Sequence, residues 1–359
     1  MTSGQMETSP VVSVVVTVYD RVQFLRGALR GVVNQTFRSF EVIVTDDSNN
    51  PEIKGICDSF QRSEIHYRAN CSPVGVALNL RAAIIETRGC YIAILNDDDA
   101  WESDFLERLV TPLKDNPERV LAFGDHWIIL EDGRVDVDRT VENTARFRRN
   151  TLQEGEIREW AMLAVLDQVV PLAMAGVFVK NAIDWDLLVG DVSGAYDFWL
   201  SCLLASSQRP AYYISRRLSS YRVHSLMETS RKSADKGENM VFIYGRLIQM
   251  ELFPGLKAPL QQAYRDALFV CGKNYLFFDR LSEGRKYFLR SFKTCPSAKA
   301  VGGLILTWLP KRIRTICVSS QRMLHRLFAF RNKGGREVIR ANEGRDAESS
   351  AVNWDENRH

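Results

Sequence analysis

A group of carboxylates directly follows an apolar stretch of the chain. Residues 91–95 (Tyr-Ile-Ala-Ile-Leu) are strand-like, and Asn96, Asp97, Asp98 and Asp99 come next. Like charges this close raise one another's pKa and repel unless a cation neutralises them, and oxygen ligands suit Mg²⁺ or Mn²⁺ rather than zinc. The expected ligand of these carboxylates is a divalent metal ion that is bound to a phosphate group. The alternative is a solvated turn, or the N-cap of a helix that begins near residue 101.

A second acidic pair favours the metal site over the turn. Residues 41–45 form another strand-like run, and Asp46 and Asp47 follow it. In open α/β sheets, ligands bind in the crevice at the carboxyl ends of the strands. Two strands that both end in carboxylates therefore indicate a single binding crevice.

The elements that must position these carboxylates alternate along the first hundred residues. Short runs rich in β-branched residues are separated by helical patterns with brief connections. This rhythm predicts an α/β fold with a doubly wound, mostly parallel sheet. The strands are expected at residues 11–17, 41–44, 65–68 and 91–95, and the helices at 22–34, 53–60 and 76–87.

The pattern becomes less regular after residue 99. Residues 136–150 are charged and lack periodicity, which predicts a mobile loop. From residue 233 the pattern is helical only, which predicts a C-terminal helical extension. The further strands are expected at residues 120–123, 173–179 and 211–214, and the further helices at 103–113, 196–205, 239–252, 260–278, 281–294 and 298–309.

These patterns divide the chain into parts. We expect an α/β domain followed by the helical extension, with flexible residues at both ends. The expected parts are residues 1–10 (flexible N-terminus), 11–230 (α/β domain), 233–333 (helical extension) and 334–359 (disordered tail).

Composition excludes several classes of protein. The net charge of +3 is too slight to indicate nucleic acid. The seven cysteines are scattered and contain no C-x-x-C pair, which argues against a disulfide framework and a zinc site and favours a reducing cytoplasm. The polar start has no signal-peptide pattern, and no stretch reaches 18 apolar residues, so neither secretion nor a membrane span is expected.

One segment of the extension can nonetheless contact a membrane. Within residues 311–333, apolar side chains such as Ile313 and Leu324 recur at helical spacing, with Lys and Arg mostly elsewhere. A basic amphipathic helix of this kind can lie on an anionic membrane, so we expect a cytoplasmic protein with a peripheral position on the inner face of the membrane. The alternative is a helix packed on the domain's own core.

Several motifs taken together resemble a known family. Residues 13–20 (Ser-Val-Val-Val-Thr-Val-Tyr-Asp), 34–37 (Asn-Gln-Thr-Phe), 40–48 (Phe-Glu-Val-Ile-Val-Thr-Asp-Asp-Ser) and 96–99 resemble the family 2 glycosyltransferases of the GT-A fold. The order and spacing match over roughly residues 10–115 and more loosely to about residue 230.

The resemblance implies a Rossmann-like nucleotide-sugar-binding half over residues 11–100 and an acceptor-binding half over residues 101–230. It also implies the residues of the nucleotide-sugar site. Thr17, Tyr19 and Asp47 would contact a uracil-like base, and Asp97 the ribose. The chemistry agrees, because a tyrosine ring can stack on a base and an Asp can accept from an imide N–H. The implied donor is a nucleotide-diphosphate sugar, with a UDP-sugar favoured.

The resemblance also implies a metal and diphosphate site. Asp98 and Asp99 would hold Mg²⁺ or Mn²⁺. Residues 220–225 resemble the family's Tyr-Arg-x-His segment, so His224 is either close to the metal or a structural histidine. Leu78 stands where the family usually has Arg or Lys, and Arg81 is the candidate that replaces this diphosphate contact, with Arg68 as a second.

Asp197 is the candidate catalytic base, because residues 194–200 resemble the segment that supplies it in the family. Asp191 is the reserve candidate. Two departures bear on this assignment, since Tyr196 replaces an acidic residue and Leu203 an Arg that are common there. A lone Asp before an aromatic run can also be a simple N-cap.

The implied activity is an inverting transfer of a sugar to a hydroxyl group of a glycan or lipid-linked acceptor, in cell-surface polysaccharide, lipopolysaccharide or other glycan synthesis. A non-catalytic nucleotide-sugar or glycan binder on the same fold is the alternative. Nucleotidyl transfer is disfavoured, because no Gly-rich, basic phosphate loop follows the first strand.

Overall fold

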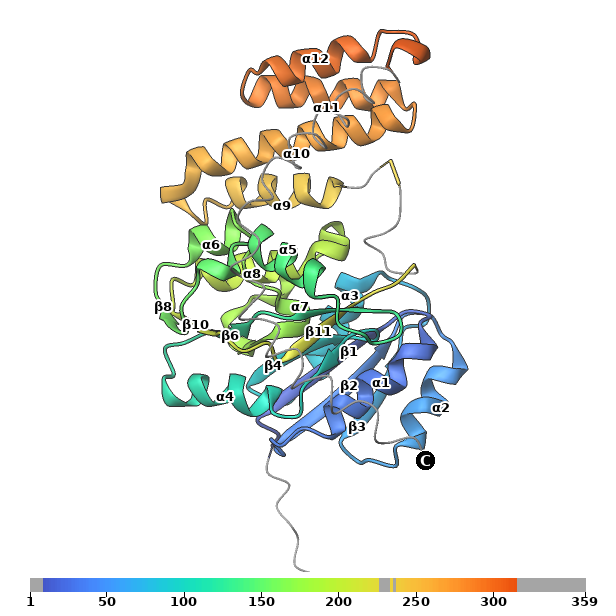
Figure 1. Cartoon of the computed structure of the whole chain (residues 1–359), viewed down its shortest axis with the longest axis vertical. Helices are drawn as coiled ribbons and strands as arrows, with labels where there is room; N and C mark the ends of the chain where they lie inside the picture. Colours follow the sequence, from blue (N-terminus) through green and yellow to red (C-terminus); the bar gives the residue numbers. More distant parts are fainter. Residues whose placement is uncertain (1–8, 226–232, 235–236, 315–359) are drawn as a thin grey trace, which may run out of the picture. The chain divides into compact units, whose positions relative to one another are not determined.

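The structure is a computed structural model that describes residues 9–225, 233–234 and 237–314 (Figure 1). It divides into two compact units, residues 1–228 with 249–256 and residues 229–248 with 257–359. Three predicted segments lie wholly or mainly outside the described residues: the N-terminus 1–10, the amphipathic segment 311–333 and the tail 334–359.

The first unit is built on an eight-stranded sheet in the order β3-β2-β1-β4-β9-β6-β10-β8. Strand β1 pairs in parallel with β2 on one side and β4 on the other, and Thr17 lies opposite both Thr45 and Asn96. These three strands therefore end at the same edge of the sheet, as the sequence predicts. Their bounds and those of β3 are β1 (Val12–Val18), β2 (Phe40–Asp46), β3 (Ile65–Ala69) and β4 (Tyr91–Asn96).

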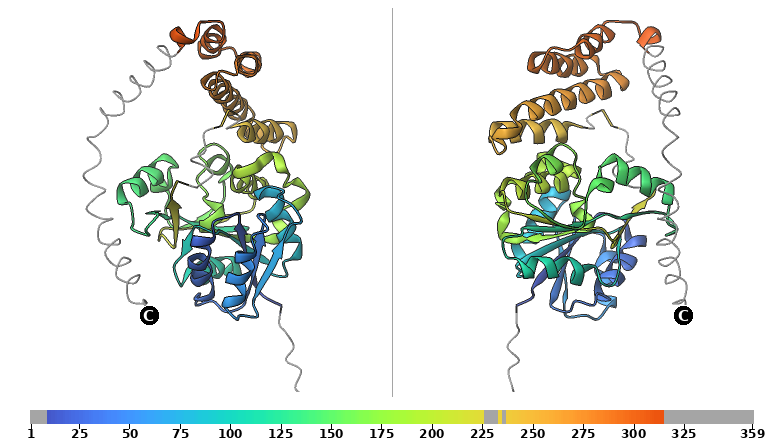
Figure 2. Two further views of the ribbon diagram at one scale, coloured as in Figure 1. Left: turned by 90° about the vertical axis from the view of Figure 1, so that its right-hand side faces the viewer. Right: turned by 60° about the vertical axis from the view of Figure 1, so that its left-hand side comes forward.

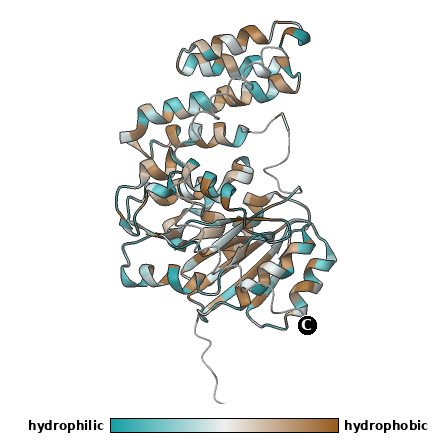
Figure 3. Cartoon of the chain, viewed as in Figure 1, coloured by the Kyte–Doolittle hydropathy of each residue, from teal (hydrophilic) through white to brown (hydrophobic). Residues whose placement is uncertain are grey.

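Helices cover both faces of this sheet (Figure 2). Val14 and Val16 of β1 belong to a core cluster with residues of α1, α2 and α4, whereas the intervening Val15 is buried outside that cluster. Helix α3 packs on β1 and β2. Figure 3 shows the apolar residues concentrated on the central strands. The fold is thus α/β and doubly wound, and these helices are α1 (Val22–Val33), α2 (Pro51–Ser59), α3 (Val76–Glu86) and α4 (Phe105–Asp115).

A small second sheet in the order β5-β11-β7 lies next to the end of β4. Strand β5 (Ala100–Trp101) begins directly after the carboxylates, and β11 (Ser219–Val223) pairs with it in antiparallel fashion and with β7 (Trp127–Leu130) in parallel. This pairing brings a segment more than a hundred residues downstream back to the carboxylates.

The remaining elements complete the other half of the sheet. Strand β9 runs antiparallel to both β4 and β6, so the sheet is mixed on this side. The elements are α5 (Val137–Arg146), α6 (Ala161–Val165), α7 (Leu172–Ala175), α8 (Tyr196–Ser206), β6 (Leu121–Gly124), β8 (Gly155–Ile157), β9 (Gly176–Val179) and β10 (Ala211–Ile214).

The predicted mobile loop over residues 136–150 is wrong, because α5 occupies most of it. Asp136 caps this helix by accepting from the backbone N–H of Arg139 at 3.0 Å. The helix buries Thr140 and Thr144 rather than aliphatic side chains, and Thr144 donates to the carboxylate of Asp125 at 2.5 Å. The inward positions Val137, Thr140, Val141 and Thr144 do recur at helical spacing, but two of them are threonines and charged residues surround them, so the segment has no apolar run that marks a helix.

The strand predicted over residues 173–179 is correct only in its second half. Residues up to Ala175 belong to the short helix α7, and β9 begins at Gly176. The carbonyl of Met174 accepts from the indole N–H of Trp101 at 2.7 Å, which anchors this helical turn.

The second unit consists of helices, as predicted. Helix α11 packs against both α10 and α12, and Phe288 of α11 lies against Gly272 and Gly303. A Cβ at either glycine would come within 2.7 Å of the Phe288 ring, so only glycine allows this approach. No helix among the described residues is long and apolar enough to span a membrane. The helices are α9 (Glu238–Gln249), α10 (Lys257–Phe277), α11 (Leu281–Thr294) and α12 (Ala298–Leu306).

Candidate active site

The three carboxylates after β4 are buried. Asp97, Asp98 and Asp99 are 0%, 4% and 1% exposed. The backbone N–H of Tyr19 donates to Oδ2 of Asp97 at 3.2 Å, which links the cluster to the end of β1. The carboxylates are therefore not part of a solvated turn, which was the alternative prediction.

Arginine and histidine side chains surround the cluster. Nη2 of Arg21 lies 2.6 Å from Oδ1 of Asp97, and Nη1 of the same guanidinium contacts Asp98. Nε2 of His224 lies 2.9 Å from Oδ2 of Asp98. The backbone N–H of Arg222 donates to Oδ1 of Asp99 at 3.0 Å. The second sheet therefore carries two residues, Arg222 and His224, to the end of β4.

The burial of these carboxylates opposes their ionisation. Burial raises the pKa of Asp97 to about 7, against the opposing charge of Arg21. Burial and then the neighbouring Asp98 raise the pKa of Asp99 well above its usual range. Oδ1 of Asp97 accepts no hydrogen bond of good geometry, although the Arg21 guanidinium is close. A positive charge close to these buried carboxylates therefore favours their ionised form.

Asp197 lies in the first turn of α8 and is partly exposed. Burial raises the pKa of its carboxyl to about 6, although the backbone N–H of Phe198 donates to it at 2.8 Å. The preceding residue, Tyr196, donates from its hydroxyl to Oδ1 of Asn96 at 2.9 Å. This bond ties the start of α8 to the strand end that carries the carboxylates. The reserve candidate, Asp191, is exposed in the preceding 3₁₀ segment.

The predicted base-binding residues lie at the ends of β1 and β2. Tyr19 is 54% exposed, so its ring is accessible to a ligand. Thr17 is buried and donates to Oδ1 of Asn96 at 3.1 Å. Both carboxylate oxygens of Asp47 accept hydrogen bonds from the segment before α3, including the backbone N–H groups of Val74 (2.9 Å) and Gly75 (2.8 Å).

The family comparison decides the identity of this domain. The model of glycosyl transferase family 2 matches residues 13–158, which include β1, β2 and the carboxylates after β4. This part of the chain is a family 2 glycosyltransferase domain. The match contains the motifs between residues 13 and 99, whereas the segments that contain Asp197 and His224 lie outside it.

Related sequences agree with this family. An uncharacterized glycosyltransferase of Methanocaldococcus jannaschii is 27% identical over 204 residues, which are 56% of this chain and 67% of that protein. An uncharacterized glycosyltransferase of Haemophilus influenzae is 26% identical over 160 residues, 44% of this chain and 49% of that protein. The chain thus spans about half to two thirds of the length of these relatives.

Solved structures share the fold. Staphylococcus aureus TarS in complex with UDP-GlcNAc has a TM-score of 0.59 and 13% identity, with 82% of this chain and 90% of that chain covered. The mannosyltransferase PcManGT of Pyrobaculum calidifontis, in complex with GDP-Man and Mn²⁺, has a TM-score of 0.53 and 16% identity, with 92% and 89% covered. The GT-A fold predicted from the sequence is confirmed.

The two arginines predicted to contact the diphosphate, Arg81 and Arg68, have other partners. Arg81 forms an ion pair with Asp186, which is 84% exposed. Arg68 is hydrogen-bonded to Thr45 and ion-paired with Glu86 at 2.9 Å. Neither arginine contacts the carboxylate cluster in the described structure. The arginines that do contact it are Arg21 and Arg222.

Sequence reasoning gave no role to Arg21, Arg222 or Asn96. Arg21 follows β1 by three residues, at the same sheet edge as the carboxylates, and this position was the available signal. Asn96 bonds to Thr17 and Tyr196 through Oδ1 and donates to Oδ2 of Asp99 at 3.0 Å. Asn96 therefore connects the end of β1, the start of α8 and the carboxylate cluster. From the sequence alone, it was the residue of the cluster expected to be least necessary.

The donor set of the family 2 site fits a hard divalent cation, since it offers several carboxylate oxygens and no thiolate. Among the residues that the structure describes, no three His, Cys, Asp or Glu side chains are already arranged around a metal position. Arg21 instead bridges Asp97 and Asp98. A metal at these carboxylates requires the guanidinium to move aside.

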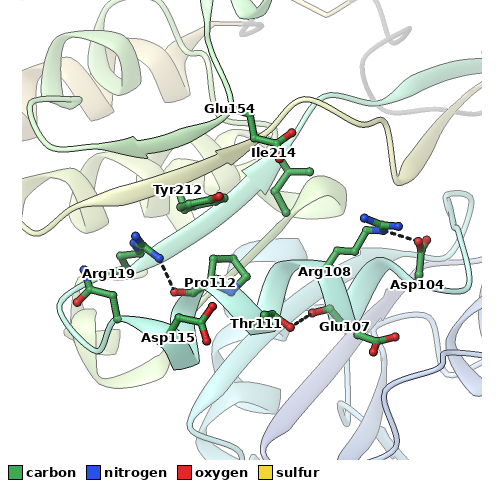
Figure 4. A pocket seen from close by; sticks show the side chains of 11 residues that line it. Asp104, Glu107, Arg108, Thr111, Pro112, Asp115, Arg119, Glu154, Tyr212 and Ile214 are labelled. Carbon is green, nitrogen blue, oxygen red and sulfur yellow. Dashed lines mark hydrogen bonds and ion pairs between the residues drawn. The ribbon is translucent and has the colours of Figure 1, made fainter.

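A cavity of about 760 Å³ lies elsewhere on the family 2 domain, beside α4 and β10 (Figure 4). The Arg119 guanidinium lies 4.7 Å from the centre of the Tyr212 ring in its wall, and Asp104 forms ion pairs with Arg108 and Arg216. None of the predicted site residues lines it. We therefore assign it no part in the chemistry of the carboxylate cluster.

Proposed function

We propose that the domain transfers a sugar from a nucleoside-diphosphate sugar, with a UDP-sugar favoured, to a hydroxyl group of a glycan or lipid-linked acceptor with inversion at the anomeric carbon. The observation that carries the proposal is the hydrogen bond between Tyr196 and Asn96. It holds the helix start that bears Asp197 beside the strand end that bears the buried carboxylates. This arrangement supports Asp197 as the proton acceptor beside carboxylates that would hold the metal of the diphosphate.

The donor site is assigned to the ends of β1, β2 and β4. The exposed ring of Tyr19 is available to stack on the base. Asp47 would accept from the base after exchanging one of its present backbone partners, and Asp97 would accept from the ribose. That TarS and PcManGT were solved with nucleotide sugars supports this class of donor.

Asp98 and Asp99 would hold Mg²⁺ or Mn²⁺, with His224 adjacent. When bound, the metal would offset the negative charge that develops on the leaving diphosphate. Arg21 and Arg222 border the same space. A guanidinium displaced from the carboxylates can bind a phosphate through two parallel N–H donors, so Arg21 replaces Arg81 as our candidate for the diphosphate contact.

Asp197 is the proposed base. Its carboxylate would take the proton of the acceptor hydroxyl as the oxygen forms a bond to the anomeric carbon and the bond to the diphosphate breaks. A pKa of about 6 suits this role, because the group is mostly ionised at neutral pH yet more basic than an ordinary aspartate. No general acid is needed, since a diphosphate leaves as an anion.

The alternative is a protein that binds a nucleotide sugar or glycan without turnover. The ion pairs of Arg21 with Asp97 and Asp98 favour it, because they neutralise the carboxylates without a metal. Synthesis of cell-surface polysaccharide, lipopolysaccharide or another glycan remains part of the proposal for the enzyme.

One experiment separates the two functions. The thermal stability of the full chain is measured with a panel of nucleotide sugars, each with and without Mn²⁺, and stabilising donors are then assayed for release of nucleoside diphosphate. Metal-dependent release, abolished in Asp197→Asn once an acceptor is supplied, supports the transferase. Saturable binding without turnover on any donor and acceptor supports the binder.

A further inference from the structure

Helix α12 of the second unit exposes an apolar stripe. Val301 and Ile305 of α12 and Trp308 in the turn directly after it are spaced as on a single helical face and are 40%, 54% and 73% exposed. From Ala300 to Pro310 the chain contains no charged residue. Exposed large apolar side chains at this density indicate a contact surface.

The opposite face of α12 is already used for packing. Ala300, Gly303 and Thr307 are buried, and Gly303 lies directly against Phe288 of α11. The helix is therefore apolar on both faces, one turned to its own unit and one turned outward. Core packing explains the first face and leaves the second unexplained.

The surroundings of the stripe are strongly basic. Residues 284–314, which comprise most of α11 and all of α12, contain eight Lys and Arg residues and no Asp or Glu. Lys299 stands at the first turn of α12, and Lys311 and Arg312 follow its end, so exposed cations lie at both ends of the stripe. Asp279 pairs with Arg314 and, at 3.7 Å, with Lys311, and offsets part of this charge.

Trp308 is held in place although it is exposed. The guanidinium of Arg285 lies 4.0 Å from the centre of its ring, and Nε of the same arginine donates to Oγ1 of Thr307 at 3.2 Å. A tryptophan with a cation beside it suits the boundary between water and lipid, where the ring sits at the level of the headgroups.

We propose that the outward face of α12, with its flanking lysines and arginines, binds an anionic membrane surface. Apolar side chains would enter the headgroup region while the cations meet lipid phosphates. A second copy of the chain on this face would bring like charges together across a symmetric contact. Nucleic acid would use the cations but leave the aliphatic stripe in water. The proposal uses only residues up to Arg314 and is independent of the proposed transferase activity.

The test is co-sedimentation of the full chain with vesicles of phosphatidylcholine alone and with vesicles of equal parts phosphatidylcholine and phosphatidylglycerol. We expect binding only to the anionic vesicles, and weaker binding as salt is added. Lipids brominated in the upper acyl chain should quench part of the tryptophan fluorescence of the protein. Trp308→Phe should remove the contribution of Trp308 to this quenching.

Matched variants separate this face from other exposed residues. Ile305→Asp should weaken vesicle binding about ten-fold. Ile85→Asp, at an isoleucine that is 68% exposed on α3, should leave it unchanged. Lys299→Glu and Arg312→Glu should each weaken binding about five-fold or more, from a contribution of about 1 kcal/mol for each cation near the surface. Lys54→Glu, at an exposed lysine of α2, is the charge control.

Several results would overturn the proposal. These are equal binding to both vesicle types, absence of binding to either, and an effect of Ile85→Asp as large as that of Ile305→Asp. Binding to RNA but not to anionic vesicles would assign the face to nucleic acid. A dimer that dissociates in Ile305→Asp, without vesicle binding, would assign it to a second copy. Circular dichroism melting verifies that each variant is folded.

Discussion

The hydroxyl of Tyr196 and the side-chain carbonyl of Asn96 form a hydrogen bond of 2.9 Å between positions one hundred residues apart. Asn96 in turn donates to Asp99 at 3.0 Å. A continuous path of side chains therefore joins the start of α8 to the carboxylate cluster. Tyr196, which departs from the acidic residue common in the family, has a structural task in this chain.

Tyr196→Phe tests this path. The change removes one buried hydrogen bond, and we expect a loss of about 1 kcal/mol in the free energy of unfolding. If the bond positions Asp197, kcat should fall while the KM for the donor changes little, because the base acts on the acceptor. Urea denaturation and steady-state kinetics measure the two effects. Tyr67→Phe, which removes a tyrosine hydroxyl that donates to Asp46 at the same distance of 2.9 Å, is the matched control.

Asp98→Asn tests the metal site. The substitution keeps the shape of the side chain but removes the charge that attracts a divalent cation. We expect turnover to fall by orders of magnitude and the stabilisation by Mn²⁺ in a thermal melt to disappear. Asp132→Asn, at an aspartate on the surface turn before Arg134, should keep both. An Mn²⁺ response that persists in Asp98→Asn would contradict this ligand assignment.

The pKa of Asp197 predicts a pH dependence of activity. Its carboxyl must be ionised to accept a proton, so kcat/KM should rise with pH through about 6 and level off above it. Asp197→Asn should lower turnover by a factor of about 10² to 10⁴ and abolish this limb of the profile. Asp191→Asn, at the exposed reserve candidate, should preserve the profile. If Asp191→Asn instead abolishes this limb and Asp197→Asn preserves it, Asp191 is the base and Asp197 is not.

The same raised pKa predicts a pH dependence of stability. The folded carboxyl holds its proton up to about pH 6, whereas the unfolded one releases it near pH 4. The folded state therefore binds more protons between these values, and its stability falls as pH rises through that window, by about 2 to 3 kcal/mol in all. Asp197→Asn should flatten this part of the curve of unfolding free energy against pH. An unchanged slope would contradict the assignment.

Local patterns predicted the parts of the fold that depend on neighbouring residues. Strands β1, β2 and β4 follow from their continuous apolar runs. Their shared edge follows from the alternation of strands with helices along the chain. Helix α5 was missed because two threonines, one of them bonded to Asp125, occupy positions of its inward face, which keeps its helical spacing but reduces its apolar character. The contacts of Arg21 with Asp98, of Asn96 with Thr17 and of Tyr196 with Asn96 were missed because each joins residues more than 75 positions apart, which no local pattern specifies.

Arg21→Ala tests whether this arginine substitutes for a cation at the carboxylates. Removal of the guanidinium leaves Asp97 and Asp98 buried without their nearest positive charge, and we expect a loss of about 3 kcal/mol in unfolding free energy without metal. Because the competing guanidinium is gone, Mn²⁺ should bind the variant more tightly than the wild type and raise its melting temperature by more. Arg26→Ala, at an exposed arginine on α1 bonded to Ser59, is the control. If Mn²⁺ stabilises both proteins equally, the two cations do not compete, and the metal must lie away from the oxygens that Arg21 contacts.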